Sequence, residues 1–180
     1  IDLISAGRFA TAEEVQDRLG LDLSRPIVLF TQHPVTTEFD AAALQAAPSL
    51  AAMRTLAQQG VQCVLTYPNN DAGGRAIIQL LDALQNENLP GIQVHRSLGR
   101  HLYHGVLALA RQPGARVACV GNSSSGIKET PAFGCPTVNI GSRQAGRLRG
   151  DNVIDATYDA PLIVAAVQRC LFDEAFRGIS

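Results

Sequence analysis

The sequence predicts an α/β domain built on a parallel, Rossmann-like sheet with helices on both faces. Short, continuously apolar segments recur along the chain, for example residues 26–30 and 61–67, and such segments are typical of strands buried on both faces. Between them, apolar residues follow helical spacing, as in Ile77, Leu81 and Leu84. Strands that alternate with helices imply right-handed crossovers and a parallel sheet, and we therefore expect this fold class.

The individual elements follow from the same patterns and from signals at their ends. Thr11 followed by Glu14 fits a capping box, in which the Glu14 side chain returns to the backbone N–H of Thr11, and Gly20 can end that helix. Pro48 is expected to break or kink a helix over residues 41–59. Further helices are expected around residues 77–84, over 98–110, just after Gly121 and over 161–176. The expected strands are residues 26–30, 61–67, 92–95, 116–120, 136–140 and 152–156, and together the elements form one domain over residues 1–180.

Charge and composition exclude several classes of function. The 15 basic and 16 acidic residues give a formal net charge of −1, so no general basic field exists to hold nucleic acid or an anionic membrane surface. No apolar run approaches the ~18 residues of a membrane span, and no signal peptide is visible. The chain begins at Ile1 without an initiator methionine, so we expect a segment upstream of it.

No His, Cys and Asp grouping has metal-ligand spacing, and no metal or cofactor is expected. The four cysteines form no C-x-x-C pair: Cys63, Cys119, Cys135 and Cys170. Three of them lie in or beside apolar runs, where a buried thiol is expected, and we therefore expect a cytoplasmic protein without a disulfide framework.

Polar residues are concentrated where the predicted strands end. A doubly wound parallel sheet binds ligands beyond the carboxyl ends of its strands, so these segments are expected to converge on one crevice. The four segments are Gln32-His33, Asn69-Asn70-Asp71, residues 121–126 and Gly141-Ser142-Arg143.

The strongest indication of a binding site is the sequence Gly-Asn-Ser-Ser-Ser-Gly at residues 121–126, which directly follows the strand at residues 116–120. We call residues 121–126 the serine turn. Free backbone N–H groups and hydroxyls before a helix suit an anion, which the helix dipole also favours. Simple helix capping is the structural alternative, but one serine would be enough for it. The turn is neither a P-loop nor a G-x-G-x-x-G fingerprint, so it predicts neither ATP hydrolysis nor a dinucleotide.

Other polar residues beside this turn are weaker candidates, each with an ordinary structural alternative. Glu129 follows Ser125 by four residues and Asn122 by seven, so the three can share a helix face and offer a carboxylate to ribose hydroxyls; otherwise Glu129 is a solvated surface residue. His33 can contact phosphate or exchange a proton, or serve only in packing.

Arg143 lies with Arg147 and Arg149 in a Gly-rich loop that suits anion binding, unless it is merely a solvated loop. The remaining candidate is Asn69, a turn residue unless the crevice is real.

Four ordered motifs resemble the hydrolysing UDP-N-acetylglucosamine 2-epimerases of the sialic-acid pathway. The motifs are Thr-Gln-His-Pro-Val-Thr-Thr at 31–37, Tyr-Pro-Asn-Asn-Asp-Ala-Gly at 67–73, Gly-Asn-Ser-Ser-Ser-Gly-Ile-Lys-Glu at 121–129 and Gly-Ser-Arg-Gln-Ala-Gly-Arg at 141–147. The resemblance implies the C-terminal half of a two-domain GT-B-type enzyme that releases N-acetylmannosamine and UDP. Its own N-terminal domain, a UDP-sugar substrate and a homo-oligomer are the implied partners. The family's acid/base carboxylates lie mainly in the N-terminal domain, so this chain alone is expected to be inactive.

The resemblance also implies roles for individual residues. Ser123 and Ser124 would hold the diphosphate and Glu129 the ribose, while Asn69, Asn122 and Arg143 complete the substrate-binding set. His33 would face the diphosphate and sugar as a contact important for turnover. Because the segment containing residues 111–114 is longer than is usual in the family, no role is transferred to His95, His101 or His104.

Three alternatives compete with this interpretation. A non-hydrolysing 2-epimerase typically has His-Arg-Arg-Glu-Asn in place of Gln32-His33-Pro34 and Asp-Ser-Gly-Gly in the serine turn, and this sequence has the hydrolysing version at both places. A GT-B glycosyltransferase would share the fold and the nucleotide site. A non-catalytic UDP-sugar-binding module is the alternative from outside enzymes.

Overall fold

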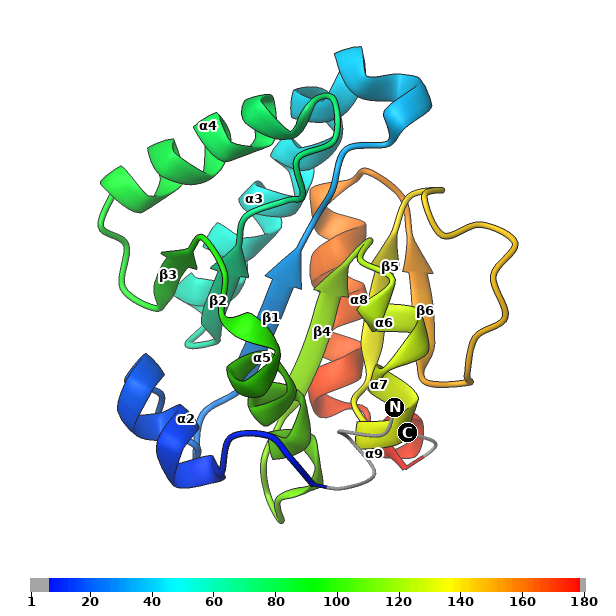
Figure 1. The fold of residues 1–180 in the computed structure, drawn as a ribbon. Coiled ribbons are helices and arrows are strands. Elements are labelled where there is room, and N and C mark those ends of the chain that lie inside the picture. The colour runs from blue at the N-terminus through cyan, green and yellow to red at the C-terminus, as the bar shows by residue number, and fades with distance from the viewer. Residues whose placement is uncertain (1–6, 179–180) are drawn as a thin grey trace.

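The computed structural model describes residues 7–178 and contains one six-stranded sheet in which every pairing is parallel (Figure 1). The strand order is β3-β2-β1-β4-β5-β6, the order of a Rossmann fold, so the predicted fold class is confirmed. All six strands lie within two residues of their predicted positions. They are β1 (Ile27–Thr31), β2 (Gln62–Thr66), β3 (Ile92–His95), β4 (Val117–Gly121), β5 (Thr137–Ile140) and β6 (Val153–Ala156).

Helices cover both faces of this sheet (Figure 1). One layer contains α3 (Ala42–Gln58), preceded by the 3-10 helix η1 (Thr36–Ala41), together with α4 (Gly74–Asn86), α8 (Ala160–Phe172) and α9 (Glu174–Arg177). The other layer contains α2 (Ala12–Leu19), α5 (Gly99–Ala108), the 3-10 helix η2 (Leu109–Arg111), α6 (Ser125–Lys128) and α7 (Thr130–Phe133).

The apolar strands contribute side chains to two separate cores, one on each face of the sheet, which explains why they have no polar face. Along β1, Val28 and Phe30 pack into the core under α3, α4 and α8, whereas Ile27 and Leu29 pack into the core under α2 and α5. Successive side chains of a strand point to opposite faces, so a strand covered on both sides must be apolar at every position.

Two helix predictions are corrected. Of the break or kink expected at Pro48, the break is wrong, because α3 continues through this residue from Ala42 to Gln58, while a kink stays a prediction. A proline removes a single backbone donor, while this helix buries Leu50, Met53 and Leu56 in the core. The C-terminal helix, expected as one element, is divided at Asp173, whose carboxylate accepts from the backbone N–H of Phe176 at 3.1 Å and so caps α9.

The first helix begins as predicted but lacks half of the capping box. Thr11 Oγ1 accepts from the backbone N–H of Glu14 at 3.2 Å, and Gly20 ends α2 in the left-handed conformation. The Glu14 carboxylate does not return to Thr11; it contacts Arg18 at 3.5 Å and His101 Nε2 at 3.0 Å. These longer-range contacts help to hold α2 against α5.

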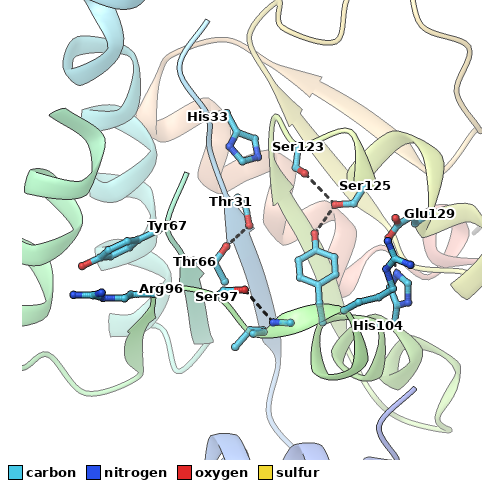
Figure 2. A pocket seen from close by; sticks show the side chains of 14 residues that line it. Thr31, His33, Thr66, Tyr67, Arg96, Ser97, His104, Ser123, Ser125 and Glu129 are labelled. Atoms are coloured by element: carbon cyan, nitrogen blue, oxygen red, sulfur yellow. Dashed lines mark hydrogen bonds and ion pairs between the residues drawn. The ribbon is translucent and has the colours of Figure 1, made fainter. Parts of the chain in front are cut away.

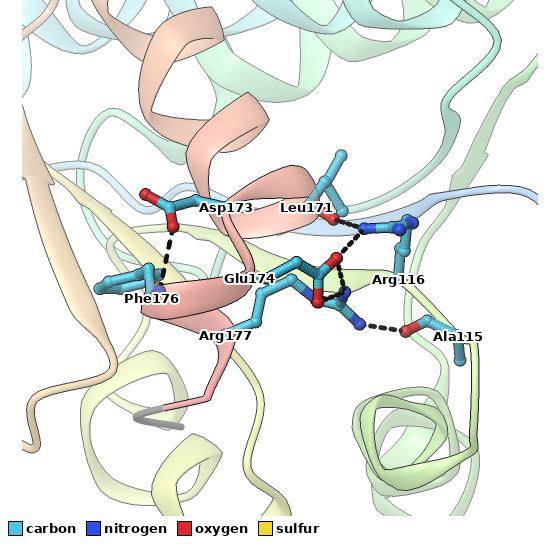
Figure 3. A network of polar contacts seen from close by, with 7 residues as sticks. All are labelled: Ala115, Arg116, Leu171, Asp173, Glu174, Phe176 and Arg177. Carbon is cyan, nitrogen blue, oxygen red and sulfur yellow. Dashed lines mark hydrogen bonds and ion pairs between the residues drawn. The ribbon is translucent and has the colours of Figure 1, made fainter.

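Helix α9 is fixed to the segment that leads into β4 by a small polar network (Figure 3). Arg116 donates to the Leu171 carbonyl at 2.7 Å and to Glu174 at 3.1 Å. Arg177 contacts the same carboxylate and donates to the Ala115 carbonyl at 2.7 Å. The network closes the end of the sheet opposite the carboxyl ends of the strands.

The cysteines are free and buried, as predicted. Burial raises the pKa of the Cys63 thiol to about 12 and that of Cys119 to about 11, so neither is disposed to act as a thiolate. Within residues 7–178, no helix is long and apolar enough to cross a membrane.

Candidate functional site

The carboxyl ends of β1 and β4 meet at the centre of the sheet, where the chain connections diverge. The helix that follows β1 lies in one layer and the helices that follow β4 lie in the other, which opens a crevice between the two strands. At the end of β4, Gly121 adopts φ +135°, and a Cβ at this position would lie 1.8 Å from the carbonyl oxygen of Thr31. Only glycine permits this close approach, which brings the serine turn directly against β1.

Asn122 joins the serine turn to the loop that follows β1. Its Oδ1 accepts from the backbone N–H of His33 at 2.6 Å, and its Nδ2 donates to the His33 carbonyl at 2.9 Å. The Asn122 side chain is only 1% exposed. The role visible in the structure is therefore to fix the backbone of His33, and a direct contact between Asn122 and a ligand stays a prediction.

His33 is held on its other side by the loop that follows β2. Its Nδ1 accepts from the backbone N–H of Asn69 at 2.9 Å, so the ring proton belongs on Nε2. Burial, assisted by the Arg143 guanidinium and opposed by Asp71, lowers the pKa of His33 from 6.5 to about 4. At neutral pH the residue is consequently a neutral imidazole that offers one N–H donor.

The loop after β5 completes the convergence of the four predicted segments. Arg143 and Gln144 both donate to the backbone carbonyl of Asn122, at 3.0 and 2.9 Å. Arg149 instead forms a bidentate ion pair with Asp155. Of the three loop arginines, Arg143 is the one positioned beside His33.

A pocket of about 290 Å³, lined mainly by residues that carry polar groups, opens at this edge of the sheet (Figure 2). Ser123 lines it from the serine turn, Glu129 from the end of α6 and His33 from the loop that follows β1. Ser124, Asn69, Asn122 and Arg143 are not among its lining residues. The complete lining is Thr31, His33, Thr66, Tyr67, Arg96, Ser97, Leu98, Gly99, Arg100, Tyr103, His104, Ser123, Ser125 and Glu129.

The segment after β4 differs from the single short helix that was expected. Two four-residue helices, α6 and α7, meet at Glu129, because Pro131 has no N–H to continue the helical hydrogen bonding. Asn122 lies before the first of them, so the helix face predicted for Asn122, Ser125 and Glu129 does not exist. Ser125 and Glu129 nevertheless both reach the pocket.

The serines do not cap α6 through their side chains. Ser124 is the residue at the helix start and makes no side-chain cap bond. Ser125 Oγ lies 2.6 Å from the Tyr103 hydroxyl and donates to Ser123 Oγ at 3.2 Å. The capping alternative is therefore not supported by the hydrogen bonds of this turn.

Sequence reasoning missed several pocket residues on the segment from β3 into α5. Arg96, Arg100, Tyr103 and His104 all line the pocket. In addition, Tyr103 contacts Ser125 and His104 contacts Glu129. For His104 the available signal was a histidine next to the apolar residues Leu102, Val106 and Leu107, since a polar residue among core positions is more informative than an apolar one. Gln144 was also missed, although it neighbours Arg143 in the same motif.

The strand order and the polar crevice define a Rossmann-like α/β protein whose open edge can accept a small polar ligand. Within the described residues, no three His, Cys, Asp or Glu side chains gather as a metal site. A sequence-family model described as UDP-N-acetylglucosamine 2-epimerase matches residues 1–180. The chain belongs to the UDP-N-acetylglucosamine 2-epimerase family.

Curated relatives agree with this assignment. A GDP/UDP-N,N'-diacetylbacillosamine 2-epimerase (hydrolyzing) of Campylobacter jejuni is 30% identical over 86% of this chain and 38% of the relative. A UDP-N-acetylglucosamine 2-epimerase of Neisseria meningitidis is 31% identical over 99% of this chain and 45% of the relative. A UDP-N,N'-diacetylbacillosamine 2-epimerase (hydrolyzing) of Legionella pneumophila is 34% identical over 90% of this chain and 41% of the relative. The chain thus spans less than half the length of these relatives.

Comparison with solved structures supports the GT-B-like fold. A sucrose-phosphate synthase from Thermosynechococcus elongatus superimposes with a TM-score of 0.58 at 21% identity, over 96% of this chain and 43% of that one. At this level of identity the likeness concerns the fold alone.

Proposed function

We propose that this chain is the nucleotide-binding C-terminal domain of a hydrolysing UDP-N-acetylglucosamine 2-epimerase, which converts UDP-N-acetylglucosamine to N-acetylmannosamine and UDP. The observation that carries the proposal is the convergence on Asn122 of the His33 segment, the serine turn and the Arg143 loop, in a member of the 2-epimerase family. In this proposal the N-terminal domain of the same cytoplasmic protein, the sugar nucleotide and a second copy of the protein are its partners.

The proposed reaction begins with elimination of UDP across C1 and C2 of the sugar. A base removes the C2 proton, the C1–O bond breaks, and UDP leaves with the bonding electrons, so that a glycal forms. Water then adds across the double bond, with the hydroxyl on C1 and the proton on the opposite face of C2. We assign the base and the acid to carboxylates of the N-terminal domain. To this chain we assign the stabilisation of UDP as it leaves.

The residues of this chain suit stabilisation of a developing diphosphate charge. The hydroxyl groups of Ser123 and Ser124 and the free N–H groups of the turn supply donors without adding a fixed charge. The neutral His33 supplies an Nε2–H donor, and Asn69 and Arg143 lie beside it. Donors that are already oriented stabilise charge with little reorganisation, which is the main means of lowering such a barrier.

Glu129 is assigned to the ribose. Its carboxylate lines the pocket beside Ser123 and Ser125 and can accept from the two ribose hydroxyls. This assignment separates the nucleoside end of the ligand, near α5, from the sugar end, near His33.

The direct test is to incubate the full-length protein with UDP-N-acetylglucosamine and to identify the products. Free UDP together with N-acetylmannosamine supports the proposal. Formation of UDP-N-acetylmannosamine without UDP release would identify a non-hydrolysing epimerase, and sugar transfer to an added acceptor would identify a glycosyltransferase. The 180-residue chain alone should bind UDP and show no turnover; UDP binding without turnover by the full-length protein would identify a binding module.

A second candidate substrate is UDP-N,N'-diacetylbacillosamine, because two hydrolysing relatives carry this sugar in their names. The two sugars differ at C4 and C6, remote from the diphosphate and ribose contacts proposed here. Parallel assays with both UDP-sugars would decide between them through the ratio of kcat/KM values.

A further inference from the structure

Two consecutive residues of α5 contact Ser125 and Glu129, which both line the pocket. The hydroxyl of Tyr103 lies 2.6 Å from Ser125 Oγ, and Nε2 of His104 lies 2.7 Å from Glu129 Oε2. Figure 2 shows His104 and Glu129 side by side at one end of the pocket. The orientation of Glu129 therefore depends on a contact with α5.

His104 is buried in a setting that allows only one useful hydrogen bond. The residue is 4% exposed, and its ring lies 5.4 Å from the ring of Phe133, measured between centroids. Its Nδ1 is buried and has no hydrogen-bond partner among residues 7–178. A proton on Nδ1 would be an unsatisfied buried donor, so the geometry favours the tautomer with the proton on Nε2, where it is donated to Glu129.

This bond is the sole hydrogen bond that the described residues make to the Glu129 carboxylate. The Glu129 side chain is 33% exposed and lines the pocket. A carboxylate has two oxygens and accepts several hydrogen bonds, so the one from His104 leaves Oε1 and further lone pairs free for a ligand.

We propose that His104 is a positioning residue, which fixes one oxygen of Glu129 and thereby turns the carboxylate toward the hydroxyls of a bound nucleotide. The proposal rests on the proposed function, in which Glu129 receives the ribose. An unsupported glutamate must give up rotamer freedom when it binds, whereas a carboxylate already held by His104 gives up less. The contribution of His104 is consequently specific to ligands that carry a ribose.

The test is calorimetric titration of the 180-residue chain with UDP and with pyrophosphate, which lacks a ribose. His104→Leu fills much of the same buried space but removes the donor, and it should weaken UDP binding roughly tenfold, as expected for coupled neighbours. Pyrophosphate binding should change less than about twofold, because no ribose is involved. His104→Gln places an amide donor near the position of Nε2 and should restore most of the UDP affinity.

A double substitution separates positioning from a general structural effect. If His104 acts through Glu129, then His104→Leu should have little further effect on UDP affinity in a Glu129→Gln background. Additive losses, or equal losses for UDP and pyrophosphate, would overturn the proposal. Thermal unfolding of each variant reports folding, and if His104→Leu does not fold, the response of the His104 ring signals to Glu129→Gln still decides.

A ligand-independent measurement distinguishes this proposal from the proposed function. In the ¹⁵N spectrum of the histidine rings, His104 should show the Nε2–H tautomer, and Glu129→Gln should shift its signals. A proton on Nδ1, or signals that do not respond to Glu129→Gln, would overturn the His104 proposal even if UDP binds. Failure of the unaltered chain to bind either UDP or pyrophosphate would instead contradict the proposed function, and with it the ligand role of His104.

Discussion

Asn122 holds the backbone of His33 at both of its polar groups, accepting from its N–H at 2.6 Å and donating to its carbonyl at 2.9 Å. These two bonds span 89 residues of sequence and join β1 to the turn after β4. An amide side chain is suited to this contact because it combines one acceptor and two donors in a plane. Neither an aspartate nor a serine could make both bonds with the same geometry.

Replacing Asn122 by alanine should destabilise the fold by ~1–3 kcal/mol, because it leaves the part-buried N–H and carbonyl of His33 without these partners. Urea denaturation would measure the free energy of unfolding. Asn70→Ala is a suitable control, since Asn70 is exposed in the neighbouring loop and should change stability by less than ~0.5 kcal/mol. Equal effects of the two substitutions would contradict a clamping role for Asn122.

The acid sensitivity of the fold should depend on His33. The pKa of His33 is lowered from 6.5 to about 4 in the folded chain, so the unfolded state takes up the proton first as the pH falls. The stability contributed by the neutral ring is fully present above pH ~6.5 and is lost as the pH falls through ~4. The loss amounts to at most ~3 kcal/mol, and to less where water screens the half-buried ring.

His33→Asn tests this dependence, because asparagine keeps an acceptor near the position of Nδ1 but does not titrate. Denaturation curves at pH 7 and pH 5 should show a smaller loss of stability for the variant than for the unaltered chain. Identical losses over this interval would show that His33 is not the group responsible.

The sheet could be predicted from the sequence because its determinants are local. Each strand is a short apolar run, and each ends at a polar or glycine-containing segment, so its position and its burial on both faces can be identified without knowing its neighbours. The rule that ligands bind beyond the carboxyl ends of the strands then placed four polar segments together. Asn122 contacts the His33 and Arg143 segments, and the Asn69 segment is joined through His33.

The partners within the site could not be predicted, because they depend on how distant segments pack. His104 and Glu129 are 25 residues apart and meet only when α5 lies against the serine turn. The expected common helix face of Asn122 and Glu129 failed for a local reason, since the helix begins only at Ser125 and is interrupted at Glu129. Proline at position 131 was visible in the sequence and could have indicated the interruption.

Gly121 should be the least replaceable glycine of the site. A Cβ there would lie 1.8 Å from the Thr31 carbonyl oxygen, and backbone atoms of a central strand cannot move away easily. Gly121→Ala should therefore cost roughly 3 kcal/mol or more. Gly114 also has a left-handed φ, of +77°, but a Cβ there would meet nothing within 4 Å, so Gly114→Ala should cost only the conformational strain of ~1–2 kcal/mol. Comparable losses for the two variants would contradict the steric argument.

Ser123 and Ser124 should contribute to ligand affinity without contributing to stability. Their joint replacement by alanine should weaken binding of UDP and of pyrophosphate, because two hydroxyl donors at the diphosphate are lost while the backbone N–H groups remain. The melting temperature without ligand should stay unchanged, since Ser124 makes no side-chain cap bond to α6. The matched control is Thr11→Ala, because Thr11 does cap α2 through its hydroxyl. That control should lower stability by ~0.5–2 kcal/mol and leave UDP affinity intact. A destabilised Ser123→Ala/Ser124→Ala variant that binds UDP normally would assign these serines to the fold and remove them from the proposed phosphate site.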